Sequence, residues 1–270
     1  MRVAFVLPLA KASALALCSS NLFAQNEFDE AREKIAAFWT ETSNPEKDPA
    51  QKAKVATDFN VLTSQLRPLI DAGILSYLNS SHAISPDDLT TQIAKALAYP
   101  YMSVNSVADA DGKVSVVPLP DQNAYAIAYD IGICASCSTS WVRIAARRDN
   151  HWVLTDLLDN PEKDSAVHLA WVGSKAGPLL ALYGVHWGDA HNRLDVRLYS
   201  VEKGFKEVWT LLNLSQGEIA IQGDRMTLKY WTQPTPWTGT KRPFREEQQV
   251  FEVDDQQVKQ LQTKLSSVQN

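Results

Sequence analysis

The sequence predicts an α+β fold with an N-terminal helical segment, an antiparallel β-meander and a short C-terminal helix. The first observation is a change of period: apolar side chains recur every three or four residues up to about residue 99, and alternate beyond Pro100. The second observation is a series of short turn signals with Gly, Asp or Asn between the alternating runs. The predicted boundaries are 1–24 for a signal peptide, 25–100 for the helical segment, 101–253 for the β region and 254–270 for the C-terminal helix or tail.

The first 24 residues have the pattern of an export signal. Arg2 supplies the positive start, an apolar run follows, and Leu22-Phe23-Ala24 before Gln25 supplies a cleavage site. The run is too short and too interrupted for a membrane-spanning helix. We therefore expect an exported protein, periplasmic or secreted, without integral membrane association after cleavage. The alternative is an N-terminal anchor that stays in place.

Charge and composition restrict the partners. The chain has 26 basic and 31 acidic side chains, and since Arg2 and Lys11 leave with the signal, the mature net charge is −7. An acidic chain without a basic run repels phosphate backbones, so nucleic acid is not expected as a partner. All eight tryptophans lie in the mature part, which indicates a well-filled core, a binding face, or both.

The helical segment begins with two apolar stripes. Their members recur at helical spacing, at Phe28, Ala31, Ile35 and Phe38, and then at Val55, Phe59, Leu62 and Leu66. Pro68 is expected to interrupt or restart the second helix.

A third helix has a clear start. Ser85 is a capping residue, Pro86 occupies the first helical position, and Asp87 and Asp88 meet the positive end of the helix dipole. Pro100 is expected to end this helix.

The β region follows from the two-residue period. Ile127, Tyr129, Ile131 and Ile133 share one face of a predicted strand, and Leu194, Val196 and Leu198 share one face of another. With the turn signals, this pattern predicts about nine or ten antiparallel strands. A sandwich, a strongly curved sheet and a partial propeller all agree with it, whereas a full propeller is not predicted because no unit repeats at a fixed period. A weak helical pattern at Val258, Leu261 and Leu265 closes the chain.

Cys134 and Cys137 form the only local constellation with a defined mechanism. In an oxidising compartment, with no other cysteine left after cleavage, they are expected to form a structural disulfide that pins a turn. Thiol–disulfide chemistry is the alternative, although the residues after Cys137 favour a strand rather than the helix that lowers a thiol pKa. A zinc knuckle would need a second pair of ligands.

His186, Asp189 and His191 group two imidazoles and a carboxylate in one predicted turn. They are weak candidates for a zinc or copper site, which needs three or four converging ligands. We expect no metal and no other cofactor, with both histidines at a plain hairpin.

The loop from Trp231 to Phe244 is the strongest candidate binding segment. It is longer than a hairpin needs, and its three prolines reduce the entropy lost on binding. Trp237 is the predicted contact residue, with Lys241, Arg242 and Arg245 as nearby cations. The alternative is that Trp231 and Trp237 fold back as a lid on the sheet.

These observations predict a non-catalytic envelope or periplasmic protein that binds a small ligand or a protein partner through its β region. The first alternative is a metal-dependent or hydrolytic enzyme that uses His186, Asp189 and His191. The second is a thiol–disulfide protein that uses Cys134 and Cys137.

Overall fold

The computed structural model divides the chain into two compact units. One comprises Met1–Ser106 with Ala145–Leu154, and the other comprises Val107–Ile144 with Thr155–Asn270. We call them the helical unit and the β unit and describe each by itself. The described residues are 26–38, 49–80, 84–97, 114–119, 123–134, 137–158, 168–173, 177–188, 191–202, 204–232, 244–254 and 257–266.

The described helices of the helical unit are an N-terminal helix at 26–38, α2 at Pro49–Ser80 and α3 at Pro86–Leu97. The predicted apolar stripes are confirmed where they are described, because each of these residues is at most 9% exposed: Phe28, Ala31, Ile35, Phe38, Phe59, Leu62 and Leu66. Phe28 packs directly over Gly73 of α2, where a Cβ would lie 2.5 Å from its ring. The close approach of the two helices therefore depends on a residue without a side chain.

The start of α3 agrees with its predicted cap. Asp88 N donates to Ser85 Oγ over 3.2 Å, and Leu89 N donates to Ser85 O over 3.0 Å. The hydroxyl therefore satisfies one of the amide groups that lack a partner within the helix.

The expectation for Pro68 was wrong, since α2 continues through it to Ser80. A proline inside a helix removes one backbone hydrogen bond and crowds the preceding turn. Leu66, Ile70 and Ile74 lie on both sides of the proline and are fully buried. Their burial offsets the local cost, which the sequence pattern alone does not reveal.

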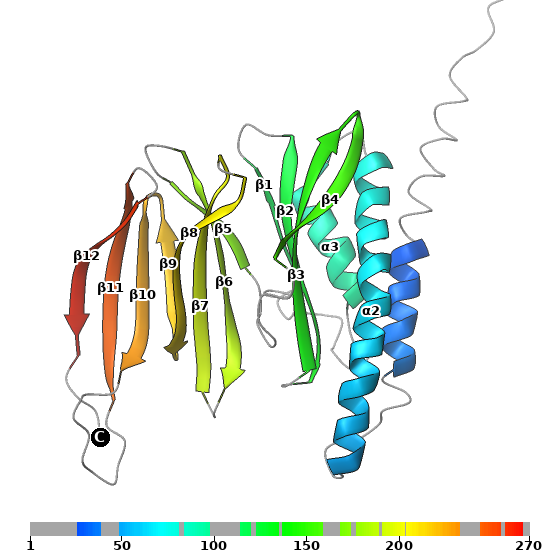
Figure 1. Ribbon diagram of the computed structural model, residues 1–270, viewed down its shortest axis with the longest axis horizontal. Coiled ribbons are helices and arrows are strands. Elements are labelled where there is room, and N and C mark those ends of the chain that lie inside the picture. The colour runs from blue at the N-terminus through cyan, green and yellow to red at the C-terminus, as the bar shows by residue number, and fades with distance from the viewer. Residues whose placement is uncertain are drawn as a thin grey trace, which may run out of the picture. The chain divides into compact units, whose positions relative to one another are not determined.

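The β region contains twelve described strands in three four-stranded antiparallel sheets, compared with the nine or ten expected (Figure 1). Each sheet is a meander in which chain order equals spatial order. The first sheet contains β1 Val114–Pro118, β2 Ala124–Cys134, β3 Cys137–Arg148 and β4 His151–Leu158. The second contains β5 His168–Val172, β6 Leu179–Gly188, β7 His191–Ser200 and β8 Lys206–Ser215. The third contains β9 Glu218–Gln222, β10 Arg225–Thr232, β11 Arg245–Asp254 and β12 Gln257–Leu265.

The first strands of the first and second sheets lie side by side and run in the same direction. Leu169 N donates to Ser115 Oγ over 3.1 Å, and Trp171 Nε1 donates to Pro118 O over 3.0 Å. The partners therefore occur in the same order along β1 and β5.

The first strands of the second and third sheets are related in the same way. Gly173 N, just after β5, donates to Gly223 O, just after β9, over 2.7 Å. The ends of β5 and β9 are therefore adjacent, and their antiparallel partners β6 and β10 point to the same end in Figure 1, so β1, β5 and β9 share one direction. Their antiparallel neighbours β2, β6 and β10 therefore all finish at the opposite end of the β unit.

The second and third sheets share one buried cluster, whose described members lie on facing sides of the two sheets. It includes Val196 and Leu198 of β7, Met226 and Leu228 of β10, and Phe251 of β11. The Trp209 ring of β8 meets Phe251 edge-on, with centroids 5.2 Å apart. This cluster fixes which side of β9–β12 is turned inward.

The predicted C-terminal helix was wrong, because Gln257–Leu265 forms the edge strand β12. Of the three apolar residues in the helical pattern, only Val258 packs against the buried cluster, whereas Leu261 and Leu265 are 48% and 51% exposed. β11 offers a row of backbone partners along its outer edge. These hydrogen bonds decided the conformation of a segment whose weak apolar stripe had little to bury.

Candidate functional site

The three segments that the sequence singled out occupy equivalent positions in the three sheets. Each is the connection from the second to the third strand: residues 135–136 after β2, 189–190 after β6 and 233–243 after β10. Because β2, β6 and β10 finish together, the strand ends that flank these connections lie at one end of the β unit, which we call the connector end. The arrowheads of β6 and β10 mark this end in Figure 1.

The cysteine pair lies at the first of these connections. Cys134 is the last residue of β2 and Cys137 is the first residue of β3, so the predicted turn lies between them. The side chains of both cysteines lie outside the described residues. The disulfide therefore stays a prediction.

The histidine pair flanks the second connection. By backbone register His186 is opposite Arg193, and His191 is opposite Gly188. The side chains of His186 and His191, and Asp189 as a whole, lie outside the described residues. Within the part of the chain that the structure describes, no three His, Cys, Asp or Glu side chains form a group that could hold a metal.

The third connection carries the aromatic pair of the connector end. Trp231 near the end of β10 and Phe244 before β11 stack with ring centroids 4.1 Å apart and an interplanar angle of 18°. Trp231 is 37% exposed and is the only exposed Phe, Tyr or Trp side chain among the described residues. Trp237, Lys241 and Arg242 lie outside the described residues.

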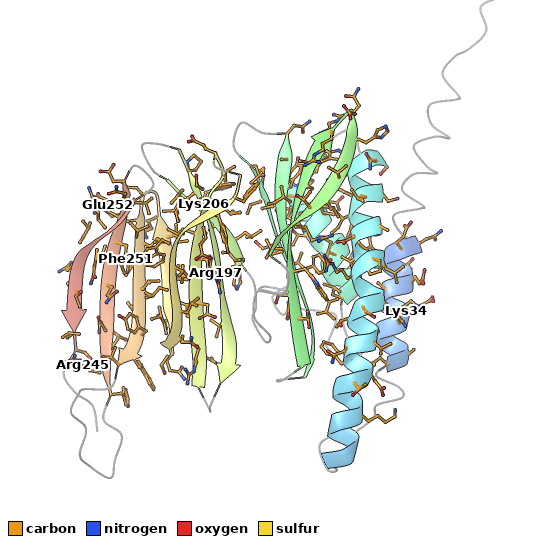
Figure 2. The ribbon with its side chains drawn as sticks, viewed as in Figure 1. Lys34, Arg197, Lys206, Arg245, Phe251 and Glu252 are labelled. Carbon is orange, nitrogen blue, oxygen red and sulfur yellow. The ribbon has the colours of Figure 1, made fainter. Side chains whose placement is uncertain are left out.

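Arg245 lies at the start of β11, on the other side of the sheet from Trp231. It is opposite Thr232, and its Nε donates to Thr232 Oγ1 over 3.4 Å. Since neighbouring residues of a strand alternate between faces, Arg245 shares the inner face with Tyr230 rather than the face of the aromatic pair. Figure 2 shows Arg245 and Glu252 toward opposite ends of this strand.

On the inner face near the connector end, two side chains donate hydrogen bonds to one carboxylate oxygen. Tyr230 Oη donates to Glu247 Oε1 over 3.0 Å, and Gln249 Nε2 donates to the same oxygen over 2.6 Å. Burial, reinforced by the Glu247 carboxylate, raises the pKa of Tyr230 above its ordinary value of 10.0. The shift favours the protonated phenol, in agreement with its role as hydrogen-bond donor to Glu247.

The outer face, which carries Trp231, differs from the inner one. Its defining members are a row across the sheet, Glu218, Lys229, Gln248 and Lys264, and the adjacent pair Trp231 and Glu246. Within the described part of the chain, the charged and amide side chains of this set make no hydrogen bond or ion pair: Glu218, Lys229, Glu246, Gln248 and Lys264. No sequence motif marks this row: alternation groups residues by face within β10 and within β11, but the register across the four strands comes only from the structure.

A buried serine–carboxylate pair in the first sheet does not have the geometry of a nucleophilic site. Ser140 Oγ donates to Asp130 Oδ1 over 3.1 Å, but Ser140 is fully buried and Asp130 is 6% exposed. A nucleophile must reach its substrate, so this pair fits a structural role.

The helical unit contains an open groove of about 380 Å³, lined in part by Lys34 and Lys54. Lys34 approaches Glu30 at 3.6 Å, and Lys54 approaches Asp58 at 2.8 Å (Lys34 is labelled in Figure 2). Because both ammonium groups have a carboxylate neighbour, neither of these two lysines offers an uncompensated charge that would select a ligand. None of the described helices combines the length and the apolarity needed to cross a membrane.

At the third of the predicted segments the structure thus describes an exposed tryptophan stacked on a half-buried phenylalanine. The cysteine and histidine chemistry of the other two segments stays a prediction. Comparison of the chain with models of known protein families, with characterised proteins and with solved structures found no match.

Proposed function

We propose that this is an exported, non-catalytic binding protein that holds its ligand at the connector end of the β unit. The observation that carries the proposal is the Trp231–Phe244 pair, in which the exposed indole is held by a ring 4.1 Å away. A tryptophan that is already fixed loses little conformational entropy when a ligand covers it. Tryptophan also offers a large contact area and a donor, which is why it is frequent at binding sites.

We also propose that the three sheets are consecutive blades of a partial propeller. Each begins with a short strand, at Val114, His168 and Glu218, and continues as a four-stranded meander. The first strands are parallel neighbours, as they are around a propeller axis. An experimental structure with the sheets packed as a sandwich would contradict this arrangement.

The metal-dependent and thiol–disulfide alternatives depend on side chains outside the described residues. No described residue favours either of them, so the sequence remains their only support.

The binding proposal is tested by NMR titration of the ¹⁵N-labelled full chain with three chemically different probes. These are maltotetraose, inorganic phosphate and a blocked tetrapeptide, acetyl-Ala-Lys-Ala-Ala-amide. We expect at least one probe to shift resonances of Trp231 and its neighbours, and Trp231→Ala to weaken that binding by roughly 5- to 100-fold. Val61→Ala is the matched control, because Val61 is an exposed apolar residue, 53% accessible, in the helical unit. Equal affinity in the Trp231→Ala variant, or no shift at the connector end with any probe, would contradict the proposal.

A further inference from the structure

We infer that the ligand class is a neutral saccharide, held on the outer face of the sheet β9–β12 beside Trp231. This inference rests on the proposed function, because it assigns the chemistry of the ligand that the connector end binds.

The backbone register builds the site as two adjacent rows. Lys229 of β10 is opposite Glu218 on one side and Gln248 on the other, and Gln248 is in turn opposite Lys264. In the next row Trp231 is opposite Glu246. Directly opposed residues have Cβ atoms about 4.5–5.5 Å apart, so the aromatic surface and the polar row are within the span of one small ligand.

The polar groups of these rows are available to a ligand. The side chains of Lys229, Glu246, Gln248 and Lys264 form no hydrogen bond or ion pair within the part of the chain that the structure describes. Farther along the same face Arg225 approaches Glu252 at 3.8 Å, so that end is internally paired. The uncommitted donors and acceptors therefore gather around the tryptophan.

The balance of charge at these rows selects against ions. Two ammonium groups, Lys229 and Lys264, are matched by two carboxylates, Glu218 and Glu246, and Gln248 is neutral. A phosphate or a polyanion would need a net positive site, and a cation would need a net negative one. A neutral ligand needs no net charge at its site.

The types of group present match a polyhydroxylated ring. Ammonium groups donate, carboxylates accept, and the glutamine amide does both, which is the mixture that sugar hydroxyls require because each hydroxyl donates and accepts. The indole supplies a flat apolar surface against which the C–H face of a pyranose can pack. Small-ligand sites typically combine an aromatic surface with a small number of polar groups that fix the orientation of the ligand.

The experiment is calorimetric titration of the full chain with three neutral oligosaccharides: maltotetraose, cellotetraose and tetra-N-acetylchitotetraose. We expect at least one to bind, with affinity lowered about tenfold or more by Trp231→Ala and about three- to tenfold by Gln248→Ala. Leu261→Ala is the matched control, because Leu261 lies on the edge strand of the same sheet, is 48% exposed and is absent from both rows. Unchanged melting temperatures establish that the variants are folded.

The outcomes separate this inference from the proposed function. In one outcome no oligosaccharide binds, but phosphate or the tetrapeptide binds and Trp231→Ala weakens that binding. This result would overturn the saccharide assignment and leave the binding proposal standing. Saccharide binding unchanged by both Trp231→Ala and Gln248→Ala would overturn the site. Failure of every probe would contradict both.

Discussion

At the scale of single residues, Asp195 shows how one buried side chain determines local backbone geometry. Its Oδ1 accepts a hydrogen bond from Asn213 N over 2.6 Å, and Asn213 has a positive φ of 63°. The register between β7 and β8 shifts here, so the strand carries a bulge. An asparagine tolerates this conformation better than most residues, and the carboxylate satisfies the amide that the bulge exposes. The sequence around residue 213 reads as an ordinary strand.

The raised pKa of Tyr199 leads to a prediction of how the stability of the β unit changes at alkaline pH. Burial, then the Glu207 carboxylate, raises the pKa of Tyr199 above its ordinary value of 10.0. The phenol of the unfolded chain loses its proton first as the pH rises, so its contribution to stability is complete below about pH 10 and is lost above it.

We therefore expect the urea midpoint of the wild-type protein to fall between about pH 10 and pH 12. The Tyr199→Phe variant should fall less steeply over this range, because the titrating group is gone. The difference between the urea midpoints of the two proteins near pH 7 measures the effect of losing the contact with Glu207, and this difference is subtracted at higher pH. Parallel curves for the two proteins would show that another group controls the alkaline transition.

At the scale of elements, α2 and β12 show where local patterns were outweighed. Pro68 indicated a break, but buried side chains on both sides of it keep α2 continuous. The apolar pattern of the C-terminal segment indicated a helix, but this segment pairs with the edge of β11 as an antiparallel strand. In both cases tertiary interactions outweighed a local preference. That preference is worth about 3 kcal/mol for a proline inside a helix and about 1 kcal/mol for strand propensity.

The strand assignment of β12 has its own test. As part of a strand, only Val258 reaches the buried cluster, so Val258→Ala should lower the free energy of unfolding by about 1 kcal/mol. Leu261→Ala and Leu265→Ala should each change it by less than about 0.5 kcal/mol, because both side chains are about half exposed. Urea unfolding measures all three variants, and equal losses would indicate the helical face that the sequence predicted.

At the scale of the whole molecule, the repeat of four-stranded meanders brings together segments that are far apart in the sequence. The three connections from second to third strand follow Cys134, Gly188 and Thr232. Their common end results from the shared direction of β1, β5 and β9. The binding site that we propose lies at the third of these connections, where Trp231 and Phe244 stack.

The compartment proposed for this molecule is tested by the intact mass of the protein recovered from the exported fraction. We expect a chain that begins at Gln25 and is lighter by two hydrogens, because Cys134 and Cys137 are joined. Alkylation before and after reduction provides the control for the cysteines. A chain that still carries Met1 would contradict the cleaved signal, and two thiols alkylated without reduction would contradict the disulfide.

The sequence by itself determined that helices precede a series of antiparallel strands, and it identified most of the helical core. These properties depend on local period, caps and turn residues, as the stripe of Phe28 and Ile35 and the cap at Ser85 illustrate. Only the tertiary structure decided that β12 is a strand, that Arg245 and Trp231 lie on opposite faces, and that Lys229, Gln248 and Lys264 form one row. Those outcomes depend on strand register and on free sheet edges, and both are set by residues distant in the chain.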